Sequence, residues 1–161
     1  MYKKILVPID GSSTSNLGIR EALKLANDQS AKLRLVHVVD ELVIMSSPEA
    51  VVPVGDIVGV LREAGRKILE RSAALVRKSG GNAETVLVER FGGRAADSII
   101  AEARKWRADL IVLGTHGRRG VRRMVLGSDA EEVVRSAEVP VLLVRSKTGD
   151  SRAAHPRRRS S

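Results

Sequence analysis

A chain of 161 residues is the length of one domain and is long enough to bury a normal hydrophobic core. It contains no cysteine, which excludes disulfides, thiolate metal sites and cysteine nucleophiles and fits a reducing compartment. The net charge of +9 raises the question of nucleic-acid binding, but residues 145–161 alone carry +5, so the rest of the chain is only mildly basic.

Apolar runs bounded by turn residues alternate along the chain with longer segments of helical period. The runs predict strands over residues 3–9, 32–39, 84–89, 109–114 and 139–145. The segments between them predict helices over residues 15–29, 57–79, 94–106 and 129–137. This alternation is typical of the α/β class and predicts one parallel sheet with helices on both faces.

The two ends of the chain bear on localisation and partners. The first apolar stretch is interrupted at Asp10, too early for the core of a secretory signal, and no run approaches the roughly 20 apolar residues of a membrane span. We therefore expect a cytoplasmic protein with no membrane span. We also expect a folded domain over residues 1–146 and a basic, disordered tail over residues 147–161, which contacts nucleic acid only nonspecifically.

Two turns carry residues suited to a ligand site. The sequence PIDG, residues 8–11, follows the first predicted strand, and GTHG, residues 114–117, follows the fourth. Ligands of open parallel sheets bind outside the carboxyl ends of the strands, where the strand order reverses. Glycines let backbone amides approach a phosphate, and Gly127 and Ser128 stand where the last helix begins, with its partial positive charge. If the two strands are neighbours, these features predict one anion site.

The spacing Gly114-x2-Gly117-x9-Gly127-Ser128, together with VPIDGS, LVHVVDE and PVLLVR, resembles the ATP-binding branch of the universal stress protein family. The likeness covers residues 2 to about 146. It implies a doubly wound five-stranded parallel sheet in the order 3-2-1-4-5 and an ATP site, with Mg²⁺ carried on the phosphates. It also implies a homodimer joined through the last strand, from Val139 to Val144, whose exposed edge invites pairing with another chain.

Carried over by position, the resemblance implies a contact for each part of the nucleotide. The first turn lies beside the adenosine, with Asp10 toward the ribose, and Val38 meets the adenine with its backbone and side chain. Gly114 and His116 line the ribose and the first phosphate, and the residues from Gly117 onward hold the phosphates. The implied set is Pro8, Ile9, Asp10, Val38, Leu113, Gly114, His116, Gly117, Arg118, Gly127, Ser128 and Asp129.

Several of these residues also have plain structural interpretations. Asp10 is a routine turn residue before glycine. Ser128 and Glu131 form a capping box, in which the two side chains satisfy the first amides of the helix themselves. Outside this set, His37 lies inside a predicted strand and is expected to be a buried, hydrogen-bonded histidine. Gly18 departs from the family pattern, because alanine is usual at this position of the first helix.

The charges near the predicted phosphate site oppose one another. Asp129, Glu131 and Glu132 offset the helix dipole by roughly 0.3 to 1 kcal/mol per exposed charge. Arginines in the preceding segment either contact phosphate through charge-assisted hydrogen bonds, form a solvated loop face or pair with these acids. These arginines are Arg118, Arg119, Arg122 and Arg123.

The function expected from these features is that of an ATP-binding, nucleotide-dependent sensor or regulator of a stress response, rather than a fast enzyme. His116 has no nucleophile beside it in the sequence, and neither a Walker P-loop nor a dinucleotide fingerprint occurs. The sequence SGGN, residues 79–82, resembles pyrophosphatase-type ATP loops, but it precedes the third strand and is expected to cap a helix. The alternatives are a slow ATPase or phosphotransfer enzyme of the same fold, using Asp10 with Mg²⁺, and a nucleotide-free interaction module.

Overall fold

A computed structural model describes residues 1–40, 54–115 and 127–145 of the chain, without the side chains of residues 54–57. The strands form one sheet in which every pairing is parallel, in the order β3-β2-β1-β4-β5. This confirms the predicted order 3-2-1-4-5. The strands are β1 (Lys4–Pro8), β2 (Lys32–Asp40), β3 (Glu84–Arg90), β4 (Leu110–Thr115) and β5 (Val141–Arg145).

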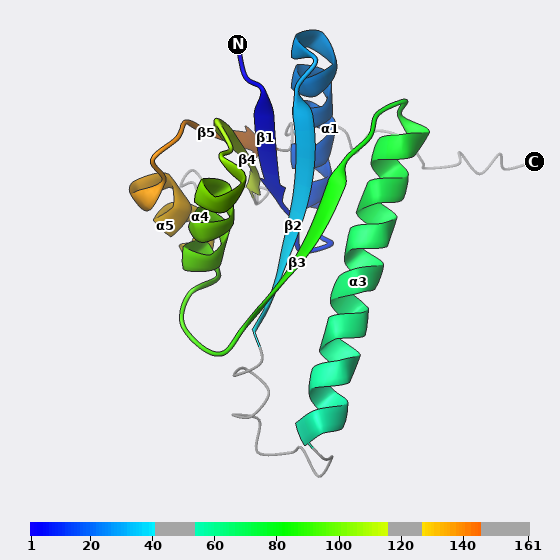
Figure 1. The fold of residues 1–161 in the computed structure, drawn as a ribbon, viewed down its shortest axis with the longest axis vertical. Helices are drawn as coiled ribbons and strands as arrows, with labels where there is room; N and C mark the ends of the chain where they lie inside the picture. The colour runs from blue at the N-terminus through cyan, green and yellow to red at the C-terminus, as the bar shows by residue number, and fades with distance from the viewer. Residues whose placement is uncertain (41–53, 116–126, 146–161) are drawn as a thin grey trace, which may run out of the picture.

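Helices cover both faces of the sheet, which confirms the doubly wound α/β fold. Figure 1 shows α1 and α3 on one side of the strands and α4 and α5 on the other. Their bounds are α1 (Ser13–Gln29), α3 (Val54–Lys78), α4 (Ala95–Trp106) and α5 (Ser128–Ser136).

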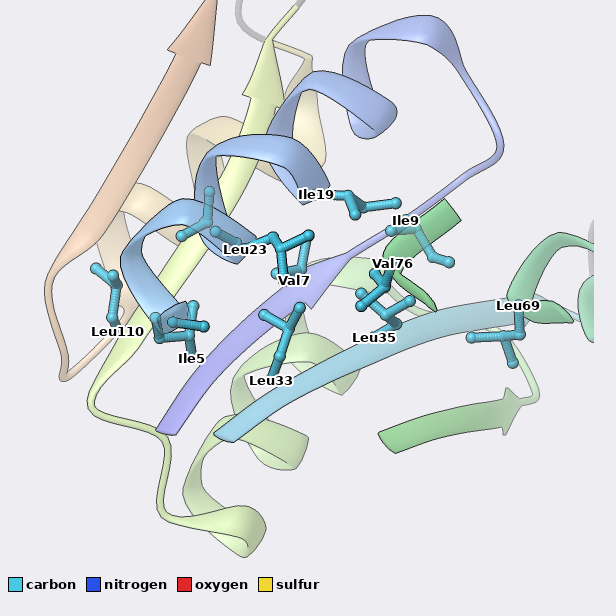
Figure 2. Close-up of a cluster of buried hydrophobic side chains, with 13 residues drawn as sticks. Ile5, Val7, Ile9, Ile19, Leu23, Leu33, Leu35, Leu69, Val76 and Leu110 are labelled. Atoms are coloured by element: carbon cyan, nitrogen blue, oxygen red, sulfur yellow. The ribbon is translucent and has the colours of Figure 1, made fainter. Parts of the chain in front are cut away.

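Two hydrophobic clusters fill the space between the sheet and its helices, because successive strand side chains point to opposite faces. Ile5 and Val7 of β1 and Leu35 of β2 pack on the side of α1 and α3 (Figure 2). Leu6 and Val36, from the same two strands, pack on the side of α4 and α5. Complete burial of one such side chain contributes roughly 1.5 to 3 kcal/mol.

Several element boundaries differ from the predicted ones by one to three residues, and those at the start of β5 and the end of α3 have clear local reasons. β5 begins at Val141 rather than at residue 139, because Pro140 has no amide to donate, although its carbonyl still accepts from Ile111 N at 3.0 Å. Helix α3 ends at Lys78, and Gly80 follows with a φ of 80° while Gly81 N donates to Val76 O at 3.1 Å. The SGGN sequence is therefore the C-terminal cap of a helix, as expected.

The edge of the sheet where the strands begin is closed by a group of charged and aromatic side chains, which we call the Arg34 cluster: Arg34, Glu84, Glu102 and Trp106. Arg34 Nη1 donates to Glu102 Oε1 at 2.7 Å, Arg34 Nε donates to Glu84 Oε2 at 2.9 Å, and the guanidinium lies 4.5 Å from the centre of the Trp106 ring. Glu102 is only 6% exposed. The cluster therefore links β2, β3 and α4.

Within the described ranges, no helix has the length and apolar character that crossing a bilayer requires.

Candidate functional site

A cleft of about 290 Å³ opens at the carboxyl ends of β1 and β4. β1 pairs with β2 on one side and with β4 on the other, so the strand order reverses at this point. A switch point of this kind is where open α/β sheets bind their ligands. Residues from β1, β2, β4, the first turn of α1 and the first two turns of α4 and α5 line the cleft.

Nine of the twelve predicted site residues line this one cleft. They come from four segments that are far apart in the sequence, and they are Pro8, Ile9, Asp10, Val38, Leu113, Gly114, Gly127, Ser128 and Asp129. The other three, His116, Gly117 and Arg118, lie outside the described residues, as do Arg119, Arg122 and Arg123. The predicted gathering of the two turns is thus observed for the part that the structure describes, whereas the binding roles remain predictions.

Asp10 makes the hydrogen bonds of a turn residue. Its carboxylate accepts from Ser12 N at 2.9 Å, and Gly11 between them has a φ of 80°. Burial raises the pKa of Asp10, but hydrogen bonds to its carboxylate, the largest from the side chain and amide of Ser12, outweigh the effect of burial, so the pKa lies below its ordinary value of 3.8. Asp10 therefore presents a carboxylate at the mouth of the cleft.

Two serines at the start of α1 also line the cleft, and the sequence analysis did not select them. The helix begins at Ser13 rather than at the predicted Ser15, because Ser12 is its N-cap and accepts from Ser15 N at 3.1 Å. Ser15 Oγ donates in turn to Ser12 O at 2.9 Å. The run of serines after Asp10 and Gly11 is the sequence signal that could have revealed this cap.

Gly114 is required by packing. A Cβ on Gly114 would overlap the carbonyl oxygen of Thr14 and would lie 2.9 Å from Ser15 N. Gly18, one turn further along α1, comes nearly as close, since its Cβ would lie 3.1 Å from Gly114 N. Glycine at position 114 therefore lets α1 pack directly on the end of β4, a reason that the sequence analysis, which assigned the glycine to phosphate approach, did not foresee.

The first turn of α5 is open, and the predicted capping box is wrong. Ser128 is the first residue of the helix, and Gly127, with φ −59° and ψ 150°, is the N-cap. Among the described residues, no side chain makes a cap hydrogen bond there, because the residue that takes the cap position has no side chain. The first amides of a helix have no intrahelical partners, so these donors face the cleft end of α5. A Cβ on Gly127 would meet none of the described residues within 4 Å.

Two of the acidic residues that oppose the α5 dipole are paired with arginines. Glu131 Oε1 accepts from Arg135 Nη2 at 3.1 Å, and Glu132 Oε2 accepts from Arg94 Nη1 at 2.7 Å. Asp129 lines the cleft and is exposed. The two ion pairs reduce the negative field at the helix N-terminus, because each acid has a cation beside it.

An apolar wall completes the cleft. Ile99 of α4 and Val133 of α5, both also members of the core, line it together with Val36 of β2 and the predicted Leu113. Sequence reasoning missed the two helical residues because the apolar period of a helix shows which face is buried but not which neighbour covers it. Other lining residues outside the predicted set are His37, Ala95, Thr115 and Ala130.

His37 is hydrogen-bonded, as expected, but it is half-buried rather than buried. Its Nδ1 lies 2.7 Å from the carbonyl oxygen of Ile9, which belongs to the turn after β1. His37 also lines the cleft. The side chain therefore connects β2 to the turn that presents Asp10.

Comparison with known proteins agrees with this geometry. The family model described as "Universal stress protein family" matches residues 1–145. Universal stress protein MJ0531 of Methanocaldococcus jannaschii is 35% identical over 90% of this chain and 83% of its own length.

Two solved structures are similar over nearly their whole length. A universal stress protein family member from Burkholderia pseudomallei is 34% identical, covers 89% of this chain and 96% of its own, and has a TM-score of 0.70. The universal stress protein from Archaeoglobus fulgidus in complex with dAMP is 25% identical, with coverages of 88% and 97% and a TM-score of 0.62. On the match of residues 1–145, this chain belongs to the universal stress protein family.

Proposed function

We propose that the cleft binds an adenine nucleotide, with ATP as the ligand. The observation that carries the proposal is the convergence of residues from β1, β2, β4 and α5, selected from the sequence, on one cleft at the switch point. The solved relative from Archaeoglobus fulgidus, which is in complex with dAMP, supports an adenine nucleotide as the class of ligand.

The chemistry of the cleft suits both halves of such a ligand. Val36, Val38 and Leu113 offer apolar surface to the flat adenine ring. The opposite end is formed by Gly127 and by the first turn of α5, whose amides and dipole favour a phosphate. Asp10 stands between these ends in the predicted order along the nucleotide, at the position assigned to the ribose.

Mg²⁺ fits this proposal as an ion that is bound to the phosphates of the nucleotide. Proteins commonly bind Mg²⁺ through substrate phosphates and one or two carboxylates, and Asp10 and Asp129 are the carboxylates that line the cleft. In the part of the chain that the structure describes, no group of three or more His, Asp or Glu residues comes together as a metal site. When bound, Mg²⁺ would neutralise phosphate charge beside the acidic first turn of α5.

The function that we propose is that of a cytoplasmic, nucleotide-dependent regulator of a stress response. Titration calorimetry with ATP and Mg²⁺ tests the binding, and a native mass spectrum of the purified protein shows whether a nucleotide accompanies it. We expect saturable binding of one nucleotide per chain. An absence of binding at about 1 mM ATP, a free energy weaker than about −4 kcal/mol, would end this proposal.

We further propose a homodimer formed through β5. β5 lies at the end of the sheet order, and Pro140 O faces β4, so the backbone groups of Val141 and Leu143 point away from β4. Sedimentation equilibrium should show a dimer for the wild type and a monomer for Leu143→Pro, which lacks the outward-facing amide. A wild-type monomer at all concentrations would contradict this interface.

We also propose that residues 147–161 act as a separable basic tail. A chain ending at residue 146 should keep the melting temperature and the ATP affinity of the full chain. It should lose any affinity for DNA, and the affinity of the full chain should fall steeply with salt. Lower stability of the shortened chain would show that these residues belong to the domain.

A further inference from the structure

The two central strands part at the cleft. β1 and β2 pair in register as far as Pro8 and Val36, and one further backbone hydrogen bond joins Ile9 N to Val36 O at 2.9 Å. β2 then continues to Asp40 while paired only with β3 in the described part of the chain. Beyond Val36, one edge of β2 therefore borders the cleft instead of a strand.

The next rung of a parallel ladder would be a hydrogen bond from Val38 N to Ile9 O. That bond does not occur between these two described residues. The carbonyl oxygen of Ile9 instead lies 2.7 Å from His37 Nδ1. A carbonyl only accepts, so Nδ1 carries the proton and donates it. Backbone groups of alternate residues face the same neighbour, so the Val38 amide points toward the cleft, as Val36 O points toward β1.

Helix α3 holds the imidazole in this position. A Cβ on Gly65 would lie 2.9 Å from His37 Cδ2 and 2.7 Å from Leu87 Cδ1, so the helix backbone packs directly against the ring. Gly65 is buried. The ring is therefore packed on one side by α3 and bonded on the other to the turn after β1.

We propose that His37 is a positioning residue for the nucleotide. Its imidazole donates to the Ile9 carbonyl oxygen, which is the acceptor that the next rung of the ladder would use. The amide of Val38 therefore stays available to an acceptor nitrogen of the adenine ring. This inference rests on the proposed function. A backbone donor without a strand partner favours a ligand acceptor, because leaving it unpaired in a half-buried place costs free energy.

A pair of substitutions separates the hydrogen bond from the packing. His37→Phe keeps a ring against Gly65 but has no donor. His37→Asn keeps an N–H donor near the place of Nδ1 but leaves a gap under α3. We expect the affinity for adenosine to fall about tenfold in His37→Phe and less than about threefold in His37→Asn. The melting temperature should move the other way, with the larger decrease in His37→Asn.

Three probes localise the effect. The affinities for adenosine and for ATP with Mg²⁺ should fall by the same factor in His37→Phe. The affinity for inorganic tripolyphosphate, which has no ring, should be the same in both variants as in the wild type. Hydrogen exchange read by NMR on the protein without nucleotide gives an independent measure. The Val38 amide should exchange quickly in the wild type and more slowly in His37→Phe, where it can reach Ile9 O.

The outcomes distinguish the role of His37 from the proposal that the cleft binds an adenine nucleotide. Absence of adenosine and ATP binding by the wild type overturns the proposed function, and the inference falls with it. If the wild type binds both, then equal affinity losses in the two variants overturn the role of His37 alone. Slow exchange of the Val38 amide in the nucleotide-free wild type has the same consequence.

Discussion

At the edge where the strands begin, polar groups have protein partners: Arg34 is bonded to Glu84 and Glu102, and the Asp109 carboxylate accepts from two backbone amides at the start of β1 at 2.8 and 3.0 Å. At the opposite edge, α5 begins without a side-chain cap and the Val38 amide has no strand partner in the described chain. One sheet thus has a closed end and an open end.

This difference predicts that the closed end of the sheet contributes mainly to stability and the open end mainly to ligand binding. Paired groups at the closed end lose stability when one partner is removed. Unpaired donors at the open end add little stability and are available to a ligand. Gly114 is the exception, because it lies at the open end but serves packing.

The largest effect is expected at the closed end. Arg34→Ala should lower the free energy of unfolding by about 3 to 5 kcal/mol, because it leaves the carboxylate of Glu102, which is 6% exposed, without its cation. Urea denaturation measures this. Lys24→Ala is the matched control, since the Lys24 and Glu21 side chains are 71% and 41% exposed and their pair should contribute less than about 1 kcal/mol. Similar losses in both variants would contradict the distinction.

Gly114→Ala tests the exception. Its Cβ overlaps the carbonyl oxygen of Thr14, so α1 must move, and the expected loss of unfolding free energy is about 1 to 3 kcal/mol. Urea denaturation measures this loss of unfolding free energy as well. Wild-type stability in this variant would show that α1 does not pack on Gly114 as closely as the structure indicates.

Gly127→Ala should change ligand affinity rather than stability, because its Cβ would meet none of the described residues within 4 Å. Its stability should stay within about 1 kcal/mol of the wild type. The affinity for ATP should fall about tenfold, equivalent to about 1.4 kcal/mol, if a phosphate lies against the N-cap of α5. Adenosine, which carries no phosphate, should bind as before. An unchanged ATP affinity would remove Gly127 from the phosphate site.

The smallest effect concerns pH. The pKa of Asp10 is depressed in the folded state, so its carboxylate stabilises the fold above the ordinary value of 3.8, and this stabilisation is lost as the pH falls through the depressed pKa. Asp10→Asn should be less stable than the wild type at pH 7, by less than about 1 kcal/mol because Asp10 is exposed. The difference should shrink below pH 3.8. Thermal unfolding at pH 7 and pH 3 measures both values, and a constant difference would argue against the depressed pKa.

Most of the fold was predictable from local patterns. Alternation of apolar runs with helical periods indicated the five strands and both helical layers, because each β-strand and helix must bury one face. The strand order came from the family resemblance. The start of β5, predicted at residue 139, could not be placed from the apolar run, because one proline decides where the ladder begins.

The site was predictable where a residue has a chemical signature and not where it depends on packing between distant segments. Asp10 and Gly127 stood out, and both line the cleft. The capping box failed because Gly127 can also take the cap position, which places Ser128 inside the helix. The bond from His37 to Ile9 joins β2 to the turn after β1, and no pattern within either segment contains it.

The comparison of the two ends is tested most directly by NMR chemical-shift changes of the backbone amides on addition of ATP and Mg²⁺. We predict the largest shifts at Val38 and in the first turn of α5, and almost none at Arg34 and Glu102. Shifts concentrated around the Arg34 cluster, or none at either end at about 1 mM ATP, would contradict the assignment of binding to the open end of the sheet.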